Sequence, residues 1–198
     1  MKQPEVDTQG EQQLLRQLTQ GDKRALQRLF DQHYVPLCRT ALRIVHRPEV
    51  AEEIVQDVFI YLWEKRGQWQ ITSSISAYLS QAVRNRSLNH LKSRAARYDW
   101  ASPIEDYQHP VQSASADDLE FSELSQVVER AVQSLPAKCQ LVYSLSRYEE
   151  CTYREIAEQL GVSIKTVEYY MGQSFKHLRQ YLEQHGYSAG CIILLYLL

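Results

Sequence analysis

Residues 153–172, YREIAEQLGVSIKTVEYYMG, have the residue spacing of a helix-turn-helix. Ala157 is small enough to let two helices pack closely, and Gly161 can adopt the positive φ that a tight turn between helices requires. Val167 is expected to point from the second helix back onto the first. In proteins with this unit, the second helix lies in the DNA major groove. The pattern therefore predicts a helical, DNA-binding chain.

Capping residues support the same interpretation. Thr152 and Glu155 have the spacing of a capping box for the first helix, and Ser163 is a favourable N-cap for the second. The alternative is a helical corner with no role in DNA binding. Because the turn residue, both caps and the apolar spacing agree, a helix-turn-helix is favoured.

The charge of the chain is segregated along its length. The 198 residues can form one large or two small domains, and a net charge of −2 does not suggest a general nucleic-acid coat. However, residues 84–97 contain basic and no acidic side chains. Residues 98–129 contain acidic side chains and no Lys or Arg. This segregation of charge is more informative about the chain than its small net charge.

Several function classes are disfavoured. The four cysteines are scattered, none is in a C-x-x-C pair, and no His lies at zinc-binding spacing from one. The sequence therefore predicts no metal, no cofactor and a reducing cytoplasmic environment. No nucleophile–base pair or phosphate-binding loop is recognisable, so we expect no enzymatic activity. The polar N-terminus lacks the apolar run of a signal peptide.

Helical spacing dominates the chain and strand-like alternation is scarce. Asp22 and either Ser74 or Ser76 are expected N-caps, Pro48 opens a helix, and Pro36 is expected in the first turn of one. The predicted organisation is a disordered N-terminus (1–11), a helical domain (12–97), a flexible acidic linker (98–116), a second helical domain (117–185) and a tail (186–198). The last eight residues of the tail are wholly apolar but too short to span a bilayer. They could pack on the protein, bind a partner or fray.

Taken in order, these segments resemble the group IV, or extracytoplasmic-function (ECF), sigma factors of the sigma-70 family. Residues 51–69 and 74–94 resemble sigma region 2, and residues 134–179 resemble sigma region 4. The amino-acid sequence of residues 72–91 is most similar to that of the Bacteroidetes members of this group. Many of those members are regulated by a membrane anti-sigma factor. The resemblance implies an all-α protein with two helical domains, a region 2 bundle and a region 4 helix-turn-helix domain.

The resemblance assigns a polymerase contact to the helix within residues 51–65. In sigma factors this segment binds the clamp helices of the polymerase β′ subunit, with further contacts to the β subunit elsewhere. The implied polar contacts are Glu53, Gln56 and Asp57, with Phe59 and Trp63 adding apolar area. Composition alone favours a solvated helix face, and it is the resemblance that favours a polymerase contact instead.

Residues 67–97 resemble the part of region 2 that melts and reads the minus-ten promoter element. A melted strand needs cations for phosphate, aromatic surfaces for bases and amides for base edges. The implied contacts are Trp69, Tyr78, Arg84, Asn85, Asn89, Lys92 and Arg94, and Arg86 is a further cation. Asn85 and Asn89 share one helix face. A core position for Tyr78 and a solvated basic helix end are the alternatives.

The second helix of the helix-turn-helix would read the minus-35 element. A helix N-terminus binds phosphate, and polar side chains there reach base edges. The implied exposed contacts are Ser163, Lys165, Thr166, Glu168, Tyr169, Tyr170 and Lys176. The acidic linker would thread the polymerase cleft as an electrostatic mimic of RNA, or would serve as a plain solubilising tether.

These implications define a sigma factor that binds core RNA polymerase and directs transcription initiation on duplex and melted promoter DNA, controlled by a membrane anti-sigma factor. The alternative is a stand-alone helix-turn-helix regulator that never joins polymerase. That alternative explains the second helical domain equally well. It does not explain an acidic–apolar helix, a basic asparagine-bearing helix and an acidic linker in that order.

Overall fold

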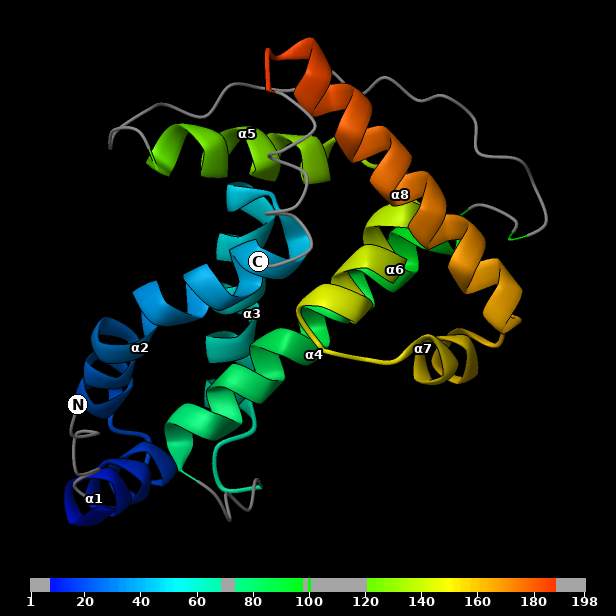
Figure 1. Ribbon diagram of the computed structural model, residues 1–198. Coiled ribbons are helices and arrows are strands. Elements are labelled where there is room, and N and C mark those ends of the chain that lie inside the picture. The colour runs from blue at the N-terminus through cyan, green and yellow to red at the C-terminus, as the bar shows by residue number, and fades with distance from the viewer. Residues whose placement is uncertain (1–7, 69–73, 98–99, 101–120, 188–198) are drawn as a thin grey trace. The chain divides into compact units, whose positions relative to one another are not determined.

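The computed structural model describes residues 8–68, 74–97, 100 and 121–187. Its contacts divide the chain into two compact units, Met1–Ser87 and Leu88–Leu198. Within the described residues there are eight helices and no strand (Figure 1). The predicted all-α class with two helical domains is confirmed.

The first unit contains α1 (Thr8–Thr19), α2 (Lys23–Val45), α3 (Pro48–Glu64) and most of α4 (Ile75–Ala95). The long helices α2 and α3 pack against each other, and α1 packs against α2. The core is formed by apolar side chains at helical spacing on these elements. They include Leu29, Leu37, Ala41, Ile44, Ile54, Val55, Val58, Leu62, Leu79 and Val83.

Three of the predicted helix starts in this unit are confirmed. Oδ1 of Asp22 accepts a hydrogen bond from the backbone N–H of Arg24 at 2.8 Å. Pro48 occupies the first position of α3, where its missing N–H is not needed. Oγ of Ser74 accepts from the N–H of Ala77 at 3.2 Å, which makes Ser74 the cap of α4. Each capping side chain accepts from a backbone N–H two or three residues further along the chain, so the sequence alone is enough to predict these caps.

The position predicted for Pro36 is wrong. It lies in the interior of the continuous helix α2, not in the first turn of a helix. Pro36 has no N–H to donate to the backbone carbonyl of Gln32, four residues before it. Both residues are exposed, so water can bond that carbonyl. The buried residues Leu29 and Leu37 lie on either side of it, and their packing keeps the helix continuous.

His46 ends α2 in a left-handed conformation, with φ 54°, and is 2 % exposed. Burial lowers the pKa of its imidazole from 6.5 to about 4. Between these values the unfolded chain binds a proton that the folded chain does not, so folding stability decreases as the pH falls. The expected loss is about 1 kcal/mol at pH 5.5 and approaches about 3 kcal/mol near pH 4.

Urea unfolding of the wild type and of His46→Asn at pH 7.5 and 5.5 measures this effect. Asn tolerates the left-handed conformation and does not titrate, so the variant should lose about 1 kcal/mol less than the wild type on acidification. Equal losses in the two proteins would show that His46 does not carry this pH dependence.

The second unit contains α5 (Phe121–Gln133), α6 (Ala137–Arg147), α7 (Tyr153–Leu160), α8 (Ile164–Gln184) and the end of α4. Helix α8 contacts α5, α6 and α7 (Figure 1). Residues 138–145 of α6 are all buried, so this helix is the centre of the unit. Its polar side chains therefore need partners within the protein.

Some expectations concern residues outside the described part of the chain. These are the N-terminus before residue 8, the linker from 101 to 116, the start of the second domain at Asp117, and the tail from 188. They stay predictions, as do the predicted domain borders. Among the described helices, none is both long and apolar enough to cross a membrane.

Candidate functional site

The helix-turn-helix forms as the sequence predicts. The backbone N–H of Glu155 donates to Oγ1 of Thr152 at 3.3 Å, and the N–H of Thr152 donates to Oε2 of Glu155 at 2.8 Å. Gly161 has φ +65° at the end of α7. Val167 on α8 is fully buried, and α7 and α8 are in contact. The capping box, the left-handed turn and the inward-pointing valine are confirmed.

Removing the Thr152 hydroxyl should destabilise the second unit. The Thr152→Ala variant loses the acceptor for the N–H of Glu155 and is expected to lower the free energy of unfolding by about 1 kcal/mol. The backbone hydrogen bond from Thr152 lowers the pKa of Glu155, so its carboxylate contribution is present at neutral pH and disappears on acidification. Denaturant unfolding of Thr152→Ala and of the cap-retaining Thr152→Ser tests this; similar losses in both would contradict a capping role.

The first turns of α8 present polar side chains to solvent. Oγ of Ser163 accepts from the N–H of Thr166 at 3.1 Å and so caps the helix. Tyr169 is 49 % exposed. The other exposed residues of the predicted minus-35 set are Ser163, Lys165, Glu168 and Lys176, whereas Thr166 is half-buried. This end of α8 therefore carries a helix N-terminus, a lysine and an aromatic ring on one accessible surface.

The expected exposure of Tyr170 is wrong, because this residue is only 1 % exposed. It follows Val167 by three residues and precedes Ser174 by four, and all three belong to the buried stripe of α8. Its hydroxyl donates to the backbone carbonyl of Trp100 at 3.1 Å. The spacing of three and four residues from these neighbours predicts that Tyr170 is buried. Sequence reasoning missed this because Tyr169, directly before it, is on the exposed side. Sequence reasoning also missed Trp100.

Helix α4 exposes three of the residues predicted to contact the minus-ten element, Arg84, Asn85 and Asn89. The Asn85 side chain accepts from Nε2 of Gln81 at 3.0 Å. Tyr78 and Lys92 are half-buried, and Trp69 lies outside the described residues. Nη1 of Arg94 donates to Oε1 of Gln140 on α6 at 2.8 Å, so this cation contacts the protein rather than solvent alone.

Arg86 does not act as an isolated cation. Its Nη1 lies 3.2 Å from Oδ2 of Asp57 on α3, with 37 % and 56 % of the two side chains exposed. The Arg86 guanidinium also lies 5.5 Å from the ring centroid of Tyr61. Such an exposed pair adds little stability, but it restricts the orientation of the Asp57 carboxylate. Sequence spacing gave no signal for this pair, because the partners belong to different helices.

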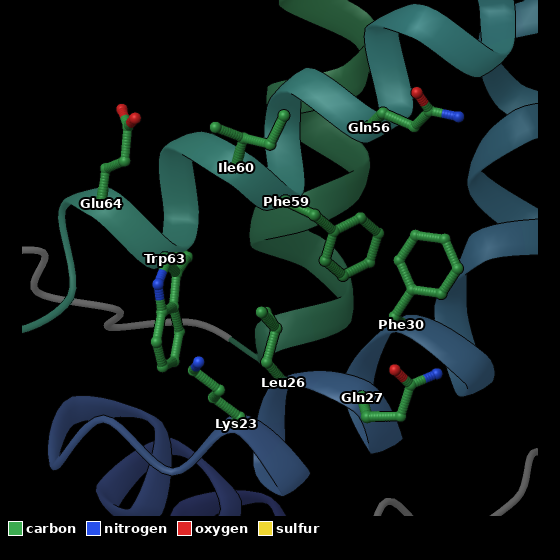
Figure 2. A pocket seen from close by; sticks show the side chains of 9 residues that line it. All are labelled: Lys23, Leu26, Gln27, Phe30, Gln56, Phe59, Ile60, Trp63 and Glu64. Atoms are coloured by element: carbon green, nitrogen blue, oxygen red, sulfur yellow. The ribbon is translucent and has the colours of Figure 1, made fainter.

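The acidic side of α3 lies beside an apolar groove. Glu53, Gln56 and Asp57 are exposed. This groove is a cavity of about 620 Å³ between α2 and α3. Figure 2 shows the side chains that line it. Its lining residues are Lys23, Leu26, Gln27, Phe30, Gln56, Phe59, Ile60, Trp63 and Glu64. Ile60 is 55 % exposed and adds apolar surface to this groove.

The two aromatic residues predicted beside this acidic face differ in exposure. Phe59 is buried, and its ring lies 5.0 Å from that of Phe30, so most of its apolar area already serves the core. Trp63 is half-buried and forms one wall of the groove (Figure 2). Of the two, Trp63 has the larger area available to a partner.

No cluster of metal-ligating side chains occurs within the described residues. What the geometry offers is two kinds of binding surface: exposed polar helix faces that suit nucleic acid in both units, and an acidic–apolar face on α2 and α3. A capped helix-turn-helix whose second helix begins on an exposed polar surface has the form of a DNA-binding domain.

Comparison of the sequence with known protein families identifies the family to which the chain belongs. The family described as Sigma-70 region 2 matches residues 29–97, and the family described as Sigma-70, region 4 matches residues 125–178. Together the two matches cover more than half of the chain. The chain belongs to the sigma-70 family, whose members are transcription initiation factors, and within it to the ECF group.

Two relatives whose sequences match most of the chain agree with this assignment. The RNA polymerase sigma-H factor of Pseudomonas aeruginosa is 24% identical over 170 residues, which are 79% of this chain and 86% of that protein. The ECF RNA polymerase sigma factor SigK of Mycolicibacterium vanbaalenii is 26% identical over 176 residues, 85% of this chain and 87% of that protein. A solved structure of the sigma factor RpoE in complex with the anti-sigma factor NepR from Bartonella quintana is 21% identical, covering 79% of this chain and 96% of that one, with a TM-score of 0.40.

Proposed function

We propose that this sigma factor binds core RNA polymerase and directs it to promoters that carry minus-35 and minus-ten elements. The observation that carries the proposal is the presence of both sigma regions in order, each with a surface suited to its task. Region 4 presents the exposed start of α8. Region 2 presents the acidic side of α3 and the exposed polar side of α4.

The polymerase contact is assigned to Glu53, Gln56 and Asp57, with Trp63 adding apolar area from the groove. Carboxylates on a rigid helix can form charge-assisted hydrogen bonds with arginines of a partner, which fix its orientation. An apolar groove next to such a polar row has the layout of a binding interface, in which a partly desolvated centre is bordered by polar groups. The proposed partner is the β′ clamp helices, with the β subunit contacting other parts of the chain.

The DNA contacts are assigned to two helices. At the minus-35 element, Lys165, Glu168 and Tyr169 would face duplex DNA, with Ser163, Thr166 and Lys176 at the borders. At the minus-ten element, Arg84, Asn85 and Asn89 would meet the melted strand. Tyr78, Lys92, Arg94 and Trp69 complete the proposed minus-ten set.

Finer proposals follow from the resemblance. We propose that the chain is of the Bacteroidetes type, because the amino-acid sequence of residues 72–91 resembles that type. We also propose that a membrane anti-sigma factor controls it, as in many members of that type. The site of action would be the cytoplasm, where the polymerase transcribes. A pull-down from a bacterium of that phylum, using the full chain as bait, should recover a membrane protein with a cytosolic sigma-binding segment.

The main proposal is tested by co-purification with core polymerase, followed by transcription on a pool of genomic promoters. Stable association together with new start sites is the expected result, and the start sites define the promoter sequence. Binding to duplex DNA without polymerase association would instead identify a stand-alone helix-turn-helix regulator. The Lys165→Glu and Asp57→Arg variants separate the two binding steps.

A further inference from the structure

Gly172 is an exposed glycine in the interior of α8 that the fold does not require. It lies in ordinary helical backbone, and a Cβ added to it would meet no side chain of another element within 4 Å. Glycine inside a helix lowers stability relative to alanine, because glycine loses more conformational freedom on folding. Neither packing nor backbone conformation therefore accounts for a glycine at this position.

The side of α8 that carries Gly172 also carries three of the residues proposed to contact the minus-35 element. At spacings of four, three and four residues, this side presents Lys165, Tyr169, Gly172 and Lys176, all of them exposed. The buried stripe of α8 is on the opposite side of the helix. Gly172 therefore leaves a gap in a row of long side chains, between a tyrosine ring and a lysine.

The distance of Gly172 from the start of α8 matches the depth of the DNA major groove. Gly172 lies about 12 Å along the helix from Ile164, its first residue, because an α-helix rises about 1.5 Å per residue. The major groove of B-DNA is about 8.5 Å deep. A helix whose first turn meets the base edges therefore leaves the groove in its third turn, where it passes the sugar–phosphate backbone. Gly172 is in that third turn.

We propose that Gly172 is the point at which the DNA backbone crosses α8, a close approach that a side chain would block; this inference rests on the proposed function. A missing Cβ lets the backbone of a ligand come nearer to the helix than any other residue allows. A phosphate over Gly172 would lie between Tyr169 and Lys176, whose hydroxyl and ammonium groups are hydrogen-bond donors. The contact fixes how deeply the start of α8 enters the groove, and it acts on every minus-35 sequence alike.

Two substitutions at Gly172 separate the space that the glycine leaves from its effect on helix stability. Gly172→Ala adds one methyl group and Gly172→Leu adds a full side chain, and both residues favour a helix more than glycine does. We expect the Tm of the second unit to rise by about 2–6 °C in both variants. A lower Tm in both would show that the fold requires this glycine, and would overturn the inference.

The matched control is Gln180→Leu, which places the same apolar side chain at an exposed position eight residues further along α8. This residue lies beyond the proposed DNA contacts. The control should bind core polymerase and promoter DNA as the wild type does. An equal loss of promoter binding in Gln180→Leu and Gly172→Leu would reveal a general effect of an added apolar side chain, and would overturn the assignment of Gly172.

The first measurement is the apparent Kd of the holoenzyme, formed with the full chain, for promoter DNA that contains a duplex minus-35 element. We expect promoter binding to be about threefold weaker in Gly172→Ala and at least about tenfold weaker in Gly172→Leu, with unchanged affinity for core polymerase. Equal losses in the two variants would assign Gly172 to helix flexibility rather than to space, and would overturn the close approach. Wild-type promoter binding with no loss in either variant would overturn the close approach alone. A wild-type holoenzyme that binds no promoter would overturn the proposed function instead.

The second measurement uses neutral methylphosphonate linkages to locate the contact. Placed one at a time along both strands of the minus-35 duplex, one such linkage should weaken binding of the wild type several-fold, because it removes a phosphate charge. The same linkage should have little effect on Gly172→Leu, in which the added side chain already displaces that phosphate. Equal effects on the two proteins at every linkage would overturn the assignment of a phosphate to Gly172.

Discussion

Replacing Asp57 with Arg should abolish association with core RNA polymerase and leave the first unit folded. The Asp57 side chain is 56 % exposed, so the change leaves the apolar core of α2 and α3 intact. The new cation would lie beside Arg86, which is 3.2 Å from the present carboxylate, and would face the arginines expected on the partner. Losing an attractive charge pair at an interface and adding a repulsive one typically costs several kcal/mol, so we expect roughly a 100-fold loss of affinity or more.

This result is measured by a pull-down or by fluorescence anisotropy with labelled sigma factor and purified core polymerase. The matched control is Asp31→Arg, which reverses an exposed acid on α2 outside the groove. The control should bind as the wild type does. Retained binding by Asp57→Arg, with circular dichroism showing a folded protein, would remove this face of α3 from the polymerase interface.

The second large effect is expected at the start of the recognition helix. Lys165 is exposed in the first turn of α8, where the helix N-terminus also attracts phosphate. Lys165→Glu replaces a cation near the DNA backbone with an anion, and should reduce transcription from minus-35-dependent promoters about tenfold or more. Because one phosphate contact is lost, the salt dependence of promoter binding should also become shallower, by about one unit of slope.

In vitro transcription over a series of KCl concentrations measures both quantities, and a polymerase-binding assay confirms that the holoenzyme still forms. Arg16→Glu on α1, an exposed cation outside every predicted DNA contact, provides the matched charge reversal. Unchanged transcription in Lys165→Glu would show that this end of α8 does not meet promoter DNA. Loss of polymerase binding would assign Lys165 a different role.

The helices and the helix-turn-helix could be predicted because their signals are local. Thr152 acts on a backbone group three residues away, Ser163 does the same, and Gly161 supplies its own backbone conformation. Where a prediction failed, a tertiary contact outweighed a local rule. Pro36 is tolerated inside α2 because buried residues on both sides pack in the core, and Tyr170 is buried because its face of α8 meets other elements.

The sequence by itself therefore determined the fold class, most of the helix starts and the two helices that we propose read DNA. The tertiary structure decided which of their side chains are available. It paired Asp57 with Arg86 across 29 residues, Arg94 with Gln140 across 46, and Trp100 with Tyr170 across 70. Hydropathy and capping report on neighbours within a helical turn, whereas these pairs form only after helices distant in sequence have packed and brought their polar groups within hydrogen-bonding distance.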